Sequence, residues 1–176
     1  KAYPFALING YLFQTVEGDH LKITKVTQVD LLDPYANDVF PTVTTIKLPG
    51  LVEMTSAVWY KNYLYVGGGG STIYVLDVTD ISKPKIVEQS IVQYNVGMIL
   101  HGNHLYAFGN REVTIFDLTN PEQMNPIKRY DVFFGEKAFA IKGNYLYIGY
   151  DDLSIYDISD PKKLKLVKKV ETAPHR

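Results

Sequence analysis

The stretch Asn62–Asp80, NYLYVGGGGSTIYVLDVTD, contains two short motifs that return along the chain. The first is centred on a leucine, and the second is a β-type run that ends in aspartate. Copies of the two motifs in the later part of the chain are 40 or 41 residues apart, at Leu64, Leu105 and Leu146 for the first and Asp77, Asp117 and Asp157 for the second. A period near 40 with several β-rich runs per unit is typical of β-propeller blades, because one small sheet must pack its faces on neighbouring sheets. We therefore expect an all-β protein, a β-propeller of four-stranded antiparallel blades.

The second unit serves as the template for a blade. Small Ser56 and Ala57 suit a crowded innermost strand near the propeller axis. Asn62 is expected to take the left-handed backbone conformation in the first tight turn, and Gly67–Gly70 is expected to reverse the chain. The four predicted strands are Met54–Tyr60, Tyr63–Val66, Thr72–Val78 and Lys85 to about Ser90.

Repetition of this pattern predicts a single domain of four blades, at about 1–50, 51–92, 93–134 and 135–176. The first unit departs from it, since Leu12 and Leu64 are 52 residues apart and the surplus falls in Thr27–Pro41. Four blades could close into a small ring or form an arc of a larger propeller. An arc would leave apolar blade faces exposed at both ends and would favour association.

Composition excludes several classes of protein. Hydrophobic residues make up 46% of the 176 residues, so the chain can bury a core. The net charge of -1 does not favour nucleic acid as a partner, and no apolar run is long enough to span a membrane in this segment. The absence of cysteine excludes disulfides and thiolate metal sites, and we expect no cofactor. Because the first residue is Lys1, we expect a processed or trimmed chain.

Paired acids and a glycine run are the most noticeable candidates for chemistry. The pairs could offer oxygens to calcium, but a short carboxylate at a strand end more often folds the following turn, and calcium requires six to eight oxygens. We therefore interpret them as structural turns. Gly67–Gly70 leads into a strand and not a helix, which argues against a phosphate cradle. The turn residues are Asp77 with Asp80, Asp117 with Asn120, and Asp157 with Asp160.

Two groups of loop residues are candidates for binding a protein partner, although ordinary solvated loops are the competing interpretation. The first group enters the innermost strands or lies in a polar hairpin loop: Glu53, Tyr94, Asn95, Arg111, Glu136 and Lys137. The second lies in the insertion, which could touch a neighbouring blade or another subunit: Leu31, Leu32, Tyr35 and Phe40. The lysines within 162–169 of the last strand are interpreted as protection of an exposed edge, with nucleic acid or anionic lipid as the alternative.

The segments Leu153–Pro161, LSIYDISDP, and Val75–Pro84, VLDVTDISKP, resemble the LVIVD-repeat family, as does the hairpin Gly143–Tyr147, GNYLY. The resemblance implies a propeller of a bacterial or archaeal surface or exported type, in a binding or scaffold role and without a defined catalytic site. It carries over no functional residue.

The leading hypothesis is therefore a non-catalytic binding or assembly module outside the cytoplasm or at the cell surface. It would act through a protein partner or through self-assembly. One alternative is an enzyme, or an accessory subunit of one, with a ligand over the channel mouth; an apolar axis lined by Ala57, Met98 and Ala138 would oppose it. No nucleophile elbow occurs. Another alternative is a structural subunit of a surface layer, filament or virion.

Overall fold

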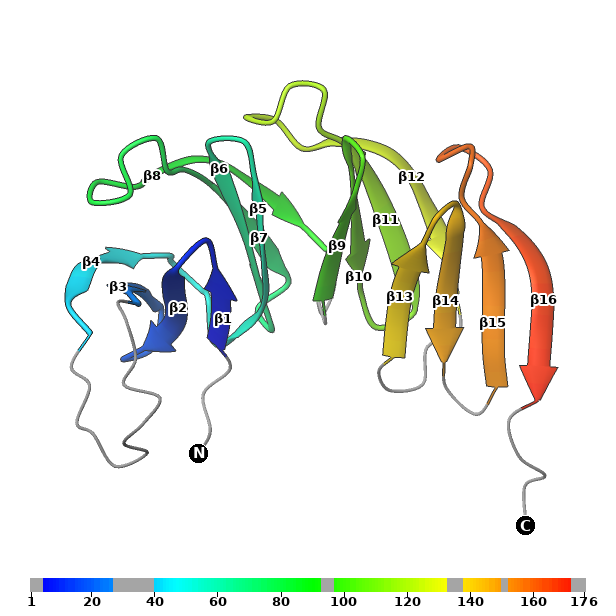
Figure 1. Ribbon diagram of the computed structural model, residues 1–176, viewed down its shortest axis with the longest axis horizontal. Helices are drawn as coiled ribbons and strands as arrows, with labels where there is room; N and C mark the ends of the chain where they lie inside the picture. The colour runs from blue at the N-terminus through cyan, green and yellow to red at the C-terminus, as the bar shows by residue number, and fades with distance from the viewer. Residues whose placement is uncertain (1–4, 27–39, 93–96, 133–137, 150–151, 172–176) are drawn as a thin grey trace, which may run out of the picture.

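Four antiparallel sheets of four strands make up the computed structural model, which describes residues 5–26, 40–92, 97–132, 138–149 and 152–171 (Figure 1). Each sheet is one blade, and its strands neighbour one another in chain order. Blade 1 contains β1 (Phe5–Ile8), β2 (Tyr11–Val16), β3 (His20–Lys25) and β4 (Thr42–Lys47), and blade 2 contains β5 (Met54–Tyr60), β6 (Tyr63–Gly68), β7 (Thr72–Asp77) and β8 (Lys85–Ile91). Blade 3 contains β9 (Gly97–His101), β10 (His104–Phe108), β11 (Glu112–Asp117) and β12 (Asn125–Asp131), and blade 4 contains β13 (Ala138–Lys142), β14 (Tyr145–Gly149), β15 (Asp152–Asp157) and β16 (Lys165–Glu171).

The predicted all-β propeller architecture is confirmed, and the described strands differ from the predicted ones by one or two residues at their ends. The four blades also share one irregularity, which lies in the pairing of the third strand with the fourth. Register shifts occur at the same place in all four blades, where one extra residue increases the local twist. They lie at Ile23/Thr24, Val75/Leu76, Ile115/Phe116 and Ile155/Tyr156.

Two predictions about turns in blade 2 are wrong. The left-handed residue of the first turn is Lys61, with φ of 55°, and not Asn62. Gly67 and Gly68 belong to β6 and do not reverse the chain. They extend the strand because the segment that links blades 1 and 2 packs closely on it. A Cβ on Gly68 would lie 2.3 Å from Leu51 Cδ1 and 2.6 Å from the Glu53 carbonyl oxygen.

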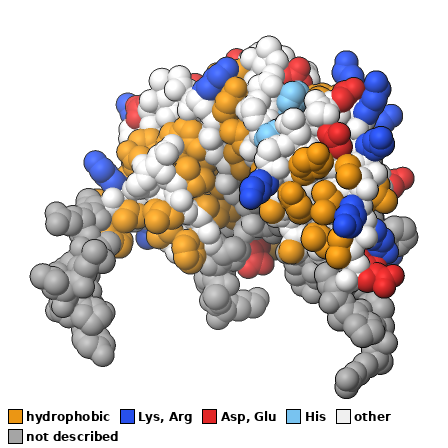
Figure 2. All heavy atoms as spheres, turned by 45° about the vertical axis from the view of Figure 1, so that its right-hand side comes forward, with side chains coloured by type: hydrophobic (Ala, Val, Ile, Leu, Met, Phe, Trp, Pro, Cys, Tyr) orange, Lys and Arg blue, Asp and Glu red, His pale blue; other side chains and the backbone are white. Residues whose placement is uncertain are grey.

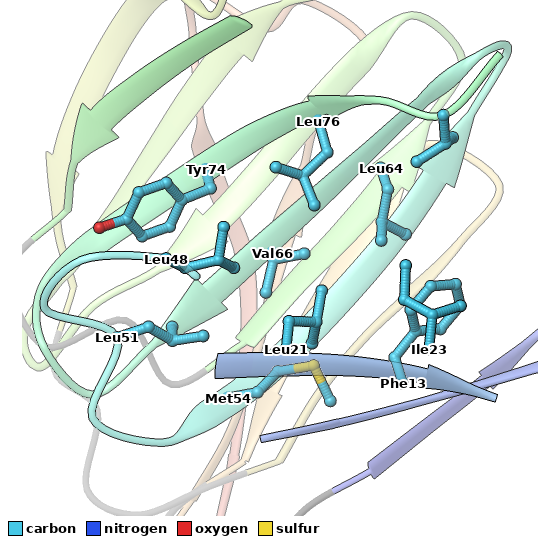
Figure 3. Close-up of a cluster of buried hydrophobic side chains, with 11 residues drawn as sticks. Phe13, Leu21, Ile23, Leu48, Leu51, Met54, Leu64, Val66, Tyr74 and Leu76 are labelled. Carbon is cyan, nitrogen blue, oxygen red and sulfur yellow. The ribbon is translucent and has the colours of Figure 1, made fainter. Parts of the chain in front are cut away.

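The hydrophobic cores lie between the blades. Three clusters of buried side chains join blade 1 to 2, blade 2 to 3 and blade 3 to 4. Figure 3 shows the first, in which Phe13, Leu21 and Ile23 of blade 1 face Leu64 and other side chains of blade 2. Because each inner sheet is covered on both flanks, β6, β7, β10 and β11 are buried along nearly their whole length rather than on alternate residues.

The blades form an open arch. The innermost strands contact in chain order, β1 with β5, β5 with β9, and β9 with β13. Figure 1 shows blades 1 and 4 at opposite ends of this arch, with the outermost strands β4 and β16 facing away from its centre. Of the two arrangements considered from the sequence, a closed ring of four blades and an arc, the structure has the arc.

Candidate functional site

The antiparallel order divides the connections of each blade between two ends. The turn between the first and second strands lies at the same end as the turn between the third and fourth, and the remaining connections lie at the opposite end. We call the end that carries the connections into the first strand of each blade the entry end, and the other the turn end.

Two of the predicted partner-binding residues lie at the entry end. Glu53 precedes β5 and Arg111 precedes β11, and both side chains are exposed. Their backbones are fixed, since the Gly69 amide donates to the Glu53 carbonyl at 3.0 Å and the Val132 amide donates to the Arg111 carbonyl at 3.0 Å. Tyr94, Asn95, Glu136 and Lys137 lie outside the described residues.

Of the insertion, the structure describes Phe40 and Pro41, which directly precede β4 at the turn end of blade 1. Phe40 is half-buried there, and the neighbouring Pro41 carbonyl accepts the Lys25 amide at 3.0 Å. Leu31, Leu32 and Tyr35 lie outside the described residues. Of the described candidates, Phe40 therefore lies at the turn end, and Glu53 and Arg111 lie at the entry end.

The repeated acids fold their own turns. Asp77 Oδ1 accepts the amide of Thr79 at 2.9 Å, and the equivalent carboxylates of Asp117 and Asp157 each accept the amide two residues on at 2.8 Å. The second member of each pair likewise accepts the amide of the residue two positions after it. Asp80 accepts the Ser82 amide at 3.0 Å, Asn120 the Glu122 amide at 3.3 Å, and Asp160 the Lys162 amide at 2.9 Å.

These hydrogen bonds also set the charge of the turns. The Thr119 hydroxyl and amide hold the pKa of Asp117 below its ordinary value, and hydrogen bonds from the residue two positions on lower the pKa of Asp77 and Asp157 in the same way. Each carboxylate is therefore ionised at neutral pH. Across the part of the chain that the structure describes, no three His, Asp or Glu side chains gather as metal ligands would.

Side chains that cross between blades were not predicted from the sequence. The Tyr65 hydroxyl donates to the Pro121 carbonyl at 2.5 Å, which ties blade 2 to the turn end of blade 3. The Met124 amide donates to Glu88 Oε2 at 2.8 Å, and the equivalent amide of blade 4, Leu164, donates to the Tyr130 hydroxyl at 3.0 Å. The corresponding residue of blade 2 is Pro84, which has no N–H to satisfy. Pro84 is therefore the sequence signal that blade 2 needs no acceptor at this position, whereas blades 3 and 4 do.

The first strands supply apolar side chains to the arch. Ala57 packs on the core between blades 1 and 2, and Met98, 6% exposed, belongs to the core between blades 2 and 3. Ala138 differs, because it is exposed and lines a hollow with Ala140 on the free flank of blade 4. The three first-strand residues considered from the sequence are thus apolar, and two of them pack on cores between blades.

The lysine-rich last strand, β16, is the outer edge of blade 4. Its side chains are mostly exposed, and some of the lysines pair with acids of the same blade. Lys169 Nζ lies 2.6 Å from Asp152 and Lys163 Nζ lies 3.5 Å from Asp160. The positive charge along this edge is therefore partly balanced from within the blade.

Comparison with known families agrees with this repeat. The LVIVD repeat model matches residues 54–91 and 137–172, which cover the strands of blades 2 and 4. The resemblance drawn from the two motifs is thus confirmed for those stretches. Among curated proteins, none matches the chain. The described residues form no helix that could cross a membrane.

Solved structures share the fold at low identity. A functionally unknown protein from Desulfotomaculum acetoxidans DSM 771 matches with a TM-score of 0.71 and 14% identity, over 93% of this chain and 55% of that one. A candidate 6-phosphogluconolactonase from Bacteroides uniformis ATCC 8492 matches with a TM-score of 0.72 and 14% identity, over 97% and 57%. The computationally designed Ika8 protein matches with a TM-score of 0.66 and 13% identity, over 96% and 48%. The chain spans about half the length of each of them.

Proposed function

We propose that the chain is a non-catalytic binding or scaffold module, exported or displayed at the cell surface, that presents protein-binding loops on a rigid propeller framework. The observation that carries the proposal is the combination of fixed backbone and exposed charge at the entry end. Glu53 and Arg111 hold their positions through main-chain hydrogen bonds while their side chains face solvent. A rigid scaffold of this kind presents loop side chains with little loss of conformational entropy on binding.

The repeated polar residues support a structural rather than a catalytic role. The strand-end aspartates are engaged in their own turns. Propellers with LVIVD repeats resemble surface or exported proteins, which supports the proposed location.

Affinity capture from the envelope and secreted fractions of the source cell tests the proposal. The baits are the wild-type chain, an E53A/R111A variant, and a K83A/K162A control that removes two exposed charges at the turn end. Any captured protein is then purified and its affinity measured. We expect E53A/R111A to bind it about tenfold more weakly, which corresponds to about 1.4 kcal/mol of binding free energy. Equal affinity of all three baits would refute the assignment of the surface.

Enzymatic activity is the alternative function, because one of the similar solved structures is a candidate 6-phosphogluconolactonase. At 14% identity that likeness concerns the fold. Hydrolysis of 6-phosphogluconolactone is measured with the same three proteins. We expect no turnover above the buffer rate, and saturable turnover by the wild-type chain would replace the binding function with a catalytic one.

A further inference from the structure

Neighbouring blades pack through two complementary flanks. Blade 1 has one of these flanks exposed, and blade 4 has the other exposed. The repeated leucines align the blades, and each pairs with a residue of the first strand. Two residues beyond the leucine, the paired first-strand position is Phe5 in blade 1, Ala57 in blade 2, Met98 in blade 3 and Phe139 in blade 4. Phe5 and Phe139 are thus the same position at the two ends of the chain.

Phe139 shows what an aromatic ring does at this position. Its ring stacks on Phe108 of blade 3, with centroids 4.0 Å apart and planes 13° from parallel. It also covers Gly97, where an added Cβ would lie 2.2 Å from Phe139 Cζ. The ring packs on the core that contains Tyr106 and Val113, which are 1% and 0% exposed. Phe139 therefore seats blade 4 on the flank of blade 3.

Phe5 has the same place in its blade, but among the described residues no other blade packs against it. Its side chain is 65% exposed, and that of Leu7, which corresponds to Ile141 of the core between blades 3 and 4, is 61% exposed. Two large apolar side chains side by side on an exposed inner strand are unusual for a surface that faces only water.

The opposite end of the arch has a hollow where such a ring would sit. On blade 4 the residues that correspond to Gly97, Phe108, Tyr106 and Val113 are Ala138, Gly149, Tyr147 and Leu153. These four, with Phe139 and Ala140, line a hollow of about 260 Å³ whose walls are mainly apolar. Small residues at 138 and 149 leave room for a ring. Tyr147 and Leu153 are partly exposed here, whereas their counterparts in blade 3 are fully covered. In Figure 2, which brings the blade 4 side forward, apolar side chains lie between lysine and arginine side chains on this part of the surface.

We propose that a second copy of this chain covers the hollow. Blade 1 of each copy packs on blade 4 of the other and seats Phe5 as Phe139 is seated within the chain. The same contact made twice about a two-fold axis closes two open arches into one ring of eight blades, so no apolar flank is left exposed. The chain itself provides both surfaces, and it spans 48% to 57% of the solved propellers it matches. The inference does not depend on which protein binds the entry end.

The contact is weaker than the interfaces within the chain. Gln14 of blade 1 stands where blades 2 to 4 have Val66, Ala107 and Ile148, so part of the new interface is polar. We therefore expect a dimer that dissociates on dilution rather than a permanent one.

Sedimentation velocity over a wide range of protein concentration tests the proposal. We expect the wild-type chain to shift from monomer to dimer, and Phe5→Asp and Leu153→Asp to require at least tenfold higher concentration for the same shift. Ile91→Asp is the matched control, because Ile91 is 74% exposed on β8 of blade 2, away from either end. Phe5 is exposed, so its replacement leaves the fold of one copy intact, which far-UV circular dichroism checks. A wild-type chain that stays monomeric, or variants that dimerise as the wild type does, would overturn the proposal.

Crosslinking distinguishes the head-to-tail contact from any other dimer. The chain has no cysteine, so Phe5→Cys and Leu153→Cys each introduce a unique thiol. With a short bismaleimide, we expect a covalent dimer from the mixture of the two variants and none from either alone. A covalent dimer from Phe5→Cys alone would place blade 1 against blade 1 and refute the ring. Because neither measurement uses a partner of the entry end, a negative result here leaves the proposed function untouched.

Discussion

Replacement of Gly97 by alanine tests how tightly the blades interlock. The added Cβ would lie 2.2 Å from Phe139 Cζ and 2.9 Å from its Cε2, well inside van der Waals contact. The ring is held by its stack on Phe108, so it must shift or the blades must separate. Overpacking of this kind costs about 1–3 kcal/mol, while loss of glycine entropy in the unfolded chain returns about 0.4–1 kcal/mol. We expect a net loss of about 1–2 kcal/mol.

Urea denaturation followed by far-UV circular dichroism measures this loss. With an m-value of roughly 2 kcal/mol/M, the midpoint should fall by about 0.5–1 M. Gly149→Ala is the matched control, and the urea curves are measured on the dilute monomer because Gly149 lines the hollow on blade 4. Its added Cβ would meet the Ala138 side chain at 3.6 Å, which is ordinary contact. We expect that control to be neutral or slightly stabilising.

A double-mutant cycle with Phe139→Leu shows whether the ring is the cause. Leucine is shorter than phenylalanine and has no atom at Cζ, so Gly97→Ala should cost less in the Phe139→Leu background, with a coupling of about 1 kcal/mol. The reasoning is refuted if Gly97→Ala is as harmless as Gly149→Ala, or if its cost is the same in both backgrounds.

Other predictions concern polar groups. Glu88→Ala leaves the Met124 amide without its acceptor and should lower stability by about 1–3 kcal/mol, whereas Glu88→Gln keeps an oxygen there and should cost less; equal urea midpoints would contradict this. Burial raises the pKa of Tyr106 to about 12, so the unfolded chain loses this proton first and stability should fall as pH rises from 10 to 12; absorbance near 295 nm that shows every tyrosine ionising near pH 10 in the folded chain would argue against it. The lowered pKa of Asp117 contributes stability above about pH 4 that is lost as pH falls through the folded-state value, and Asp117→Asn, which keeps an acceptor, should flatten the acid limb of the urea midpoint against pH; an unchanged limb would exclude this contribution.

The sequence was sufficient for the fold because the repeated signals are local. The leucine of the second strand and the aspartate that ends the third mark the same places in each blade, and the strands around them follow from short apolar runs and turns. The errors lie where distant segments meet. Gly68 was predicted to turn, yet the linker residues Leu51 and Glu53 pack against it and extend the strand. Asn62 was expected in the left-handed conformation that Lys61 adopts.

The candidate sites depended even more on packing. Neither the link from Glu88 to the Met124 amide nor that from Tyr130 to the Leu164 amide follows a repeated pattern, since they join residues 34 or 36 positions apart and use different side chains. The sequence allowed a ring or an arc, and only the arrangement of the blades shows that Phe5 is 65% exposed. The binding roles of Glu53 and Arg111 stay a prediction.

The open arch is tested most directly by electron paramagnetic resonance distances between pairs of spin labels in one chain. Asn9, Asn62 and Asn144 lie in the first turns of blades 1, 2 and 4 and are exposed, so each accepts a labelled cysteine in this cysteine-free chain. A large excess of unlabelled chain removes distances between copies. The arch predicts that labels at 9 and 144 are much farther apart than labels at 9 and 62. Equal distances for the two pairs would mean that blade 4 is as close to blade 1 as blade 2 is, which is a closed ring of four and contradicts the account.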